Sequence, residues 1–512
     1  MNQHERPHGV GTASSDPNQF FQTAHLQKDL KGRSIRGGAV TLVSQGFKFL
    51  LQTGGTFFLA RLLLPEDFGL IGMVTIVLNF VELFKDLGLS AATIQKPDIN
   101  HAQVSTLFWI NIGFSLLITV LVAVLAPVIA VFYGEARLTP IVLCLSVNFM
   151  IGGLAVQHLA LLKRQMQFGS IARIEIVSMV TGVGTATVAA GMGMGYWSLI
   201  IWRLVQSLTT LVGAWLMCRW RPGLISRYGN VSSMLVFGSN MAGFHIVNYF
   251  SRNADNFLIG RFWGAQQLGL YAIAYKLLLL PIEQINLPLT NVALPTLSRL
   301  QEEPEKFQRY YYQAILIAAS LGMPIAGFLF ACADLIIPLA LGQQWMPVIP
   351  IFRWLIPAAY VGTCGIAMGW AFTALGRVEQ QFRWGLFASS LTVLIFVISV
   401  RWGALGVAVG YGCSRPLFLI LGLSFCYRGT FLKLSDLVQI LAKPFLASVG
   451  AIGLLLLINQ WFPDSIHSAL LLLLDCTLYS LFYLMLWIVQ PDGLSSLREM
   501  LKMVHSLRAV GS

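Results

Sequence analysis

Charged residues are scarce in this sequence of 512 residues. They make up 11% of the chain, against 56% hydrophobic residues, whereas a soluble globular protein carries about 25% charged residues. The apolar segments follow one another with only short polar stretches between them, which leaves no room for a soluble domain. The composition therefore predicts an all-α polytopic membrane protein, because a helix satisfies its own backbone hydrogen bonds in lipid.

Sequence signatures of catalysis and nucleotide binding are also missing. The chain has no Gly-Lys dipeptide and hence no P-loop for ATP. It has neither the G-x-S-x-G of many serine hydrolases nor the D-x-D of common metal-dependent sugar transferases. Glu66 and Asp67 are adjacent acids in a short loop, and we expect them to mark a helix start. We expect no enzymatic activity, no cofactor and no metal.

The seven cysteines form no C-x-x-C motif, and nearly all of them lie in or beside apolar segments. We expect them to act as small hydrophobic residues rather than as a disulfide or metal framework. The net charge of +12 comes from basic residues spread over many short loops. It therefore indicates membrane topology and not a nucleic-acid partner.

A helix needs about 20 apolar residues to cross the hydrocarbon layer, and the sequence offers about fourteen such segments. We predict them at 37–62, 68–92, 104–132, 139–161, 171–193, 195–217, 233–259, 266–291, 309–331, 347–375, 381–400, 403–426, 437–460 and 465–489. The predicted domains are a disordered cytoplasmic tail at 1–36, a first lobe at 37–218, a linker at 219–232, a second lobe at 233–428, two further spans within 429–490 and a cytoplasmic tail at 491–512.

The distribution of lysine and arginine orients these spans. With both termini in the cytoplasm, the cytoplasmic segments hold about six times as many basic residues as the opposite segments, in line with the positive-inside rule. The basic residues expected on the opposite side are Arg61, Arg137, Arg261 and Arg401.

The two sets of six spans carry an internal repeat. ARLLLPEDFGLIGM at 60–73 aligns with GRFWGAQQLGLYAI at 260–273, at a spacing of about 200 residues. An even number of spans in each set brings both sets into the membrane from the same side. We therefore predict two parallel six-helix repeats with a site between them. The identical pairs are Arg61 with Arg261, Gly69 with Gly269, and Leu70 with Leu270.

Basic residues inside the spans are the main functional signal. An ionised group at bilayer depth costs roughly 2.5–3.5 kcal/mol on insertion scales, so it persists where it pairs or faces water. Lys48, Lys276 and Arg415 lie near the midplane, and Arg252 lies toward the outer end of its span. We interpret these four residues as candidates that line a wet cavity and bind an anion. Structural pairing between helices is the alternative.

Acidic residues in the same segments are candidates for ion pairing or for ion coupling. Asp255 follows Arg252 by three residues, so the two share a helical face and can pair. Glu82 and Lys85 have the same spacing. The coupling and ion-pair candidates are Asp255, Glu283, Glu82 and Lys85, of which Glu283 shares a face with Lys276.

Short motifs along 37–430 carry a family resemblance. They include KDLGLSAATIQK (85–96), STLFWIN (105–111), LLKRQMQF (161–168), SRNADNFLIGR (251–261), GLYAIAY (269–275), VALPTLSRLQ (292–301), GQQW (342–345) and ALGR (374–377). Their order and spacing resemble the polysaccharide transporter family of the multidrug/oligosaccharidyl-lipid/polysaccharide (MOP) flippase superfamily. The subgroup that they resemble contains the Wzx-type exporters of colanic-acid-like, exopolysaccharide and O-antigen units.

The resemblance implies a flippase. It would move an oligosaccharide linked to undecaprenyl pyrophosphate from the cytoplasmic to the periplasmic leaflet of a bacterial inner membrane, driven by an ion gradient or the membrane potential. Its implied partners are this lipid-linked oligosaccharide, membrane lipids and other polysaccharide-assembly membrane proteins. Cationic cavity residues are the family's substrate contacts, and we carry that role over to Lys48, Arg252 and Lys276.

Two other functions remain open at this point. A membrane glycosyltransferase, polymerase or ligase of polysaccharide assembly would call for a large outer loop with acidic residues, and the sequence contains none. An ion-coupled small-molecule antiporter with the same fold, like those of the MATE family, would call for an acidic cavity, whereas the midplane excess here is basic.

Overall fold

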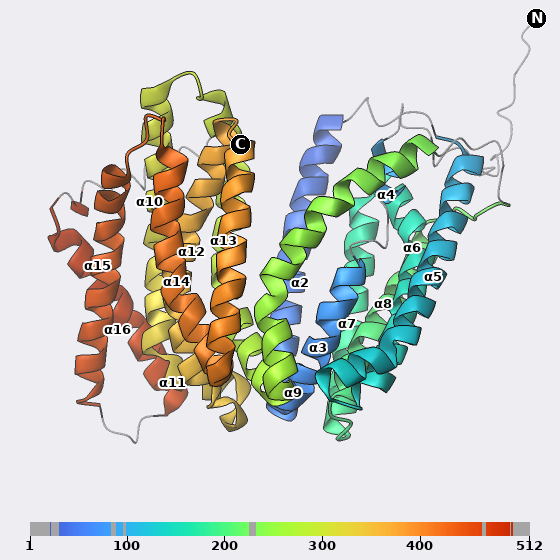
Figure 1. Ribbon diagram of the computed structural model, residues 1–512, viewed down its shortest axis with the longest axis horizontal. Helices are drawn as coiled ribbons and strands as arrows, with labels where there is room; N and C mark the ends of the chain where they lie inside the picture. Colours follow the sequence, from blue (N-terminus) through green and yellow to red (C-terminus); the bar gives the residue numbers. More distant parts are fainter. Residues whose placement is uncertain are drawn as a thin grey trace, which may run out of the picture. The chain divides into compact units, whose positions relative to one another are not determined.

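Helices make up all the regular structure in the described part of the chain (Figure 1). The computed structural model describes residues 21, 30–82, 89–95, 99–224, 232–462, 467–491 and 493–494. The first half holds α2 (Leu30–Leu62), α3 (Pro65–Glu82), α4 (Leu89–Gln95), α5 (His101–Tyr133), α6 (Leu138–Arg164), α7 (Phe168–Gly191) and α8 (Trp197–Met217). The second half holds α9 (Ser232–Arg299), α10 (Pro304–Ala331), α11 (Ala333–Leu341), η2 (Gln343–Trp345), α12 (Val348–Ala374), α13 (Val378–Ser399), η3 (Val400–Trp402), α14 (Gly403–Tyr427), α15 (Leu434–Asn459) and α16 (Ser468–Val489).

The predicted fold class is confirmed. Ten helical stretches of the described residues are long and apolar enough to cross a membrane. Two of these stretches, Arg252–Arg299 and Val378–Tyr427, are each divided by a backbone break. As far as the residues are described, helices occupy the predicted positions of all fourteen spans, with α2 and α3 at the first two and 83–88 of the second span outside the described part. The chain is therefore an all-α polytopic membrane protein.

Several boundaries differ from the prediction. Helix α2 begins at Leu30, inside the stretch predicted as a disordered tail, and Phe21 is buried in an apolar cluster with Phe108 and Trp220. The short helix α4 begins within the predicted span 68–92 and continues to Gln95. Helix α11 was not predicted, because nine residues are too few to show a clear helical period in the sequence.

The described contacts group the chain into two compact units, and the units do not coincide with the two repeats. The second unit contains 247–512 together with 56–77 and 128–138, which are the adjoining ends of α2 and α3 and the α5–α6 junction. The divisions inside α2 and α5 fall after Gly55 and Pro127. Glycine and proline are the residues at which helices most readily bend.

Helix α9 is folded back on itself. At Gly264 the backbone has φ 76° and ψ −174°, a conformation that only glycine adopts without strain. The carboxylate of Asp255 accepts a hydrogen bond from the Tyr271 hydroxyl at 2.9 Å. In a straight helix these residues would lie roughly 24 Å apart at 1.5 Å per residue. The segments before and after Gly264 are therefore two antiparallel helices, as the separate predicted spans 233–259 and 266–291 require.

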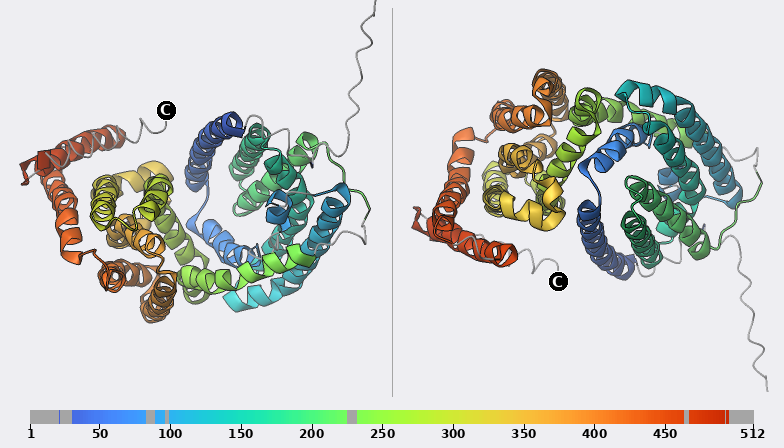
Figure 2. Two further views of the ribbon diagram at one scale, coloured as in Figure 1. Left: turned by 90° about the horizontal axis from the view of Figure 1, so that it is seen from above. Right: turned by 90° about the horizontal axis from the view of Figure 1, so that it is seen from below.

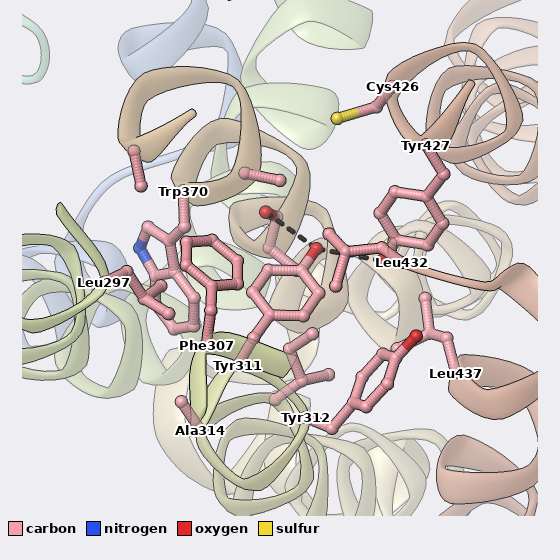
Figure 3. Packing of buried hydrophobic residues seen from close by; sticks show 14 of the residues in the cluster. Leu297, Phe307, Tyr311, Tyr312, Ala314, Trp370, Cys426, Tyr427, Leu432 and Leu437 are labelled. Carbon is pink, nitrogen blue, oxygen red and sulfur yellow. Dashed lines mark hydrogen bonds between the residues drawn. The ribbon is translucent and has the colours of Figure 1, made fainter. Parts of the chain in front are cut away.

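The second unit has a large apolar core at one end of its helices (Figure 3). Tyr311 of α10 is fully buried there, and its hydroxyl contacts the Ala367 carbonyl at 3.0 Å and the Tyr427 hydroxyl at 2.9 Å. These bonds satisfy the only polar atom of a side chain that otherwise packs among Phe307 and Trp370. They tie α10 to α12 and α14, which run side by side (Figure 1).

Helices α15 and α16 lie along one side of this bundle and pack against α10 (Figure 2). Hydroxyl groups supply the connection. Ser448 of α15 contacts the hydroxyls of Tyr360 and Tyr479, each at 2.8 Å, and donates to the Met323 carbonyl at 3.1 Å. All three hydroxyls lie directly over Gly327, where a Cβ would overlap them. Polar bonds between helices substitute here for the hydrophobic effect, which does not act between helices in lipid.

We expect Gly327→Ala to lower the stability of the protein by about 1–3 kcal/mol, because the methyl group displaces buried hydroxyls from their partners. Thermal unfolding of the purified protein in detergent measures this loss. Gly453→Ala in α15 is the matched control, since no described atom lies within 4 Å of its Cβ position. Equal melting temperatures for the two variants would contradict the proposed role of the hydroxyl cluster.

Candidate functional site

A pocket of about 440 Å³ lies wholly inside the second unit, between α9, α12, α13 and α14. Its size falls in the range of small-ligand sites. Its charged and principal aromatic residues are Arg252, Asp255, Tyr275, Trp384, Tyr411 and Arg415. Three of the eight residues proposed from the sequence thus come together in one cavity, from two helices that are far apart in the chain.

Asp255 is the buried member of this charged group, with 3% of its surface exposed. One carboxylate oxygen accepts from Tyr271, and the other accepts from the Asn256 backbone N–H at 2.8 Å. The Arg415 guanidinium adds an attractive charge interaction. The ion pair that the sequence allowed between Asp255 and Arg252 is not formed between these two described residues.

The two arginines have different surroundings. The Arg415 guanidinium lies 4.4 Å from the centre of the Tyr411 ring, and its Nε atom is buried without a hydrogen-bond partner among the described residues. The Arg252 side chain is exposed at the pocket. A cation over an aromatic face is held in place by the ring's quadrupole while its outer N–H groups stay free for a ligand. The pocket therefore contains two guanidiniums and one carboxylate that is already hydrogen-bonded.

Tyrosine side chains connect the two sides of the pocket. The Tyr275 hydroxyl contacts the Tyr411 hydroxyl at 3.2 Å, and the Tyr411 ring stacks on Phe396 with ring centres 6.0 Å apart. Trp384 of α13 stacks on Phe425 with ring centres 6.2 Å apart. Sequence reasoning missed these aromatic walls. The available signal was the presence of Trp and Tyr within predicted spans.

Lys276 and Lys48 lie elsewhere. Lys276 is half-buried in the second unit, and its ammonium donates to the Thr56 hydroxyl at 3.1 Å. Lys48 lies in the first unit and forms an ion pair with Glu175 of α7 at 2.9 Å. The expectation that Lys48 faces a cavity rested on the lack of an acid on its own helix. Glu175, which was not a candidate, supplies that acid from another helix.

The remaining acidic candidates are outside the pocket. Glu283 of α9 is exposed. Glu82 ends α3 and interacts electrostatically with Arg203 of α8. Lys85, its predicted partner, lies outside the described residues. Neither residue is among those that line the pocket.

The adjacent acids Glu66 and Asp67 lie in the first turn of α3, as predicted. The Asp67 carboxylate accepts from the Leu64 backbone N–H at 2.9 Å, which caps the helix start. Glu66 pairs with Arg137. Arg137 also bonds to Glu135, and this hydrogen bond lowers the pKa of the Glu135 carboxyl. We interpret these charged residues as a structural network near the junction of α2 and α3.

Comparison with known proteins places this chain. A family model described as "Polysaccharide biosynthesis protein" matches residues 58–350, which is more than half of the sequence. The chain belongs to the polysaccharide biosynthesis protein family. This confirms the resemblance to the polysaccharide transporters that the sequence motifs indicated.

Several proteins of polysaccharide biosynthesis are similar over most of the chain. The teichuronic acid biosynthesis protein TuaB of Bacillus subtilis is 30% identical over 382 residues, which cover 73% of this chain and 78% of TuaB. The lipopolysaccharide biosynthesis protein WzxC of Escherichia coli is 27% identical over 356 residues, covering 69% and 72%. The succinoglycan biosynthesis transport protein ExoT of Rhizobium meliloti is 23% identical over 453 residues, covering 88% and 91%.

A solved structure shares the fold of this family member. The lipid II flippase MurJ in its inward closed conformation matches with a TM-score of 0.69 at 13% identity, over 87% of this chain and 97% of MurJ. At this identity the likeness shows the common fold alone.

The Lys48–Glu175 pair yields a testable prediction. The two side chains are 23% and 34% exposed, so this salt bridge is intermediate between a solvent-exposed one and a fully buried one. We expect Lys48→Ala to destabilise the protein by about 1–3 kcal/mol, because it leaves the Glu175 carboxylate without its counter-charge. Adding Glu175→Gln should restore most of that loss. A double-mutant cycle on thermal unfolding in detergent measures the coupling, and simple additivity would show that the pair contributes nothing.

Proposed function

We propose that this family member is a flippase for a polyprenyl-pyrophosphate-linked oligosaccharide, working by alternating access. The cargo would pass from the cytoplasmic to the periplasmic leaflet of a bacterial inner membrane and would then enter a surface exopolysaccharide, O-antigen or capsule. Both termini would lie in the cytoplasm, as the positive-inside distribution predicts. Undecaprenyl pyrophosphate is the carrier that we infer for the substrate.

The observation that carries this proposal is the arginine-lined pocket of the second unit. A guanidinium matches the geometry of carboxylates and phosphates and stays charged at any physiological pH. Arg252 and Arg415 outnumber the single carboxylate, and that carboxylate already accepts two hydrogen bonds. The pocket thus favours an anionic group, and Trp384 offers a flat apolar face against which a sugar ring can pack.

The pocket also supports the flippase over the two alternatives. An antiporter of cationic drugs needs an acid-rich site, whereas two arginines dominate here. A polymerase or transferase needs converging catalytic groups. The pocket offers one carboxylate, and Tyr271 and a backbone N–H hold it. The hydrated chamber between the two repeats, with Lys48 and Lys276 as substrate contacts, stays a prediction from the sequence.

Deleting the gene in its host should trap the lipid-linked oligosaccharide on the cytoplasmic leaflet and abolish the corresponding surface polysaccharide. The reason is that the large polar head group does not cross the hydrocarbon layer unaided. Extraction of the lipid fraction, with sugar analysis, measures the trapped unit and identifies the glycan. Normal surface polysaccharide in the deletion strain would overturn the proposal.

Arginine variants test the pocket itself. Arg252→Gln and Arg415→Gln should each lower export about ten- to hundredfold, the loss expected when one or two charge-assisted hydrogen bonds disappear. Complementation of the deletion strain, with quantification of surface polysaccharide, measures this effect.

Arg383→Gln provides the matched control for these variants. Arg383 lies on α13, a helix that also lines the pocket, but its side chain is exposed and paired with Glu379. Export should remain normal in this variant. Equal export by the control and both pocket variants, at equal protein levels in the membrane, would remove the pocket from the transport mechanism.

A further inference from the structure

Two glycines that occupy matching positions in the internal repeat contact the opposite repeat in the same way. A Cβ built on Gly69 would overlap the backbone oxygen of Ala265, and a Cβ built on Gly269 would overlap the backbone oxygen of Pro65. Ala265 and Pro65 themselves occupy matching positions at the repeat spacing. The contact is therefore reciprocal, as in an isologous interface between two copies of one surface.

Backbone meets backbone at this contact. Neither glycine has room for a side chain, which allows the start of α3 and the second arm of α9 to approach as closely as two helices can. The side chains beside the glycines are buried: Leu70 and Met73 on α3, and Leu268 on α9, each have less than 1% of their surface exposed. All of these residues belong to the second unit.

Hydrogen bonds link other elements at the same end of the bundle as this contact. The Trp345 indole N–H donates to the Ala60 carbonyl at 2.7 Å, and the Gln344 amide donates to the same oxygen at 2.9 Å. The Arg61 guanidinium donates to the Leu339 and Ala340 carbonyls at the end of α11. Each bond satisfies a terminal carbonyl of a helix, a group that water can serve equally well once it is exposed.

We propose that the paired glycines Gly69 and Gly269 form the closed gate at the α2–α3 end of the transport path, and that this contact parts during each cycle. This inference rests on the proposed flippase function. No side chain lies between the two backbones, and the bonds around the contact end on carbonyls that water can also serve. Helices α2 and α5 pass from one compact unit to the other at Gly55 and Pro127, two residue types at which helices readily bend.

If this contact is the gate, replacing either glycine with alanine should make the buried residues beside it more accessible to water. Met73→Cys serves as the probe, in a background in which Cys144, Cys413 and Cys476 are serine, because Met73 is buried beside Gly260 on α9. Labelling by a membrane-impermeant maleimide should be about tenfold faster in Gly69→Ala and in Gly269→Ala than in the parent, which corresponds to about 1.4 kcal/mol.

Gly72→Ala is the control on the same helix. Its Cβ would lie 3.4 Å from the Leu268 side chain, an ordinary contact, so its labelling should match the parent. The double variant Gly69→Ala with Gly269→Ala should label no faster than about twofold above either single variant, because one methyl group already parts a shared contact. Parent-like labelling in both single variants, or fully multiplicative effects, would overturn the gate.

Trp345→Phe keeps the test valid if the glycine variants fail to accumulate. It retains an aromatic ring and removes the bond to Ala60, so it should increase labelling by a smaller factor than the methyl groups do. Unchanged labelling in Trp345→Phe, when neither glycine variant accumulates, would overturn the proposal. The labelling needs no substrate, so it tests the gate separately from the flippase function. The labelling can support the gate while lipid-linked oligosaccharide analysis rejects the flippase, and the opposite result is also possible.

Discussion

The free-energy cost of charge inside a membrane organises this protein. Each ionisable side chain within the described spans must pair, accept hydrogen bonds or reach a wet surface. Lys48 meets Glu175, Asp255 accepts from Tyr271, and Arg415 lies over Tyr411. Glu175 comes from a helix distant in sequence and Tyr271 from the other arm of α9, so these two charges also help to select which helices pack together, whereas Arg415 and Tyr411 lie one turn apart on α14. A residue that completes no such arrangement, such as the exposed Arg252 at the pocket, is the strongest candidate for binding a ligand.

The packing of the helices depends on close contacts between small residues and on polar contacts. In lipid the hydrophobic effect does not drive helices together, so close backbone approach and hydrogen bonds replace it. The glycine pair of α3 and α9 illustrates the first, and the hydroxyls over Gly327 illustrate the second. The two contacts differ in one respect. The hydroxyl cluster is buried on all sides and joins α15 and α16 firmly to α10, whereas the glycine contact is bordered by bonds that water can replace.

The sequence predicted the membrane class, the positions of the spans and the repeat because each depends on local composition or on direct comparison of two segments. It also located Asp255, Arg252 and Arg415 as charges at membrane depth. It did not predict α11, because so short a helix has no clear period. The aromatic walls were missed as well, since an aromatic residue in a span is equally compatible with lipid, core or pocket.

Length, hydropathy and charge distribution alone thus determined that the chain is a multi-pass helical protein with basic residues inside its spans. The tertiary structure decided which of those residues act together. Lys48 and Glu175 are 127 positions apart in the chain, and no helical periodicity reports such a distance. The physical reason is that the cost of an isolated charge is a property of one segment, whereas its neutralisation depends on which helices pack against each other.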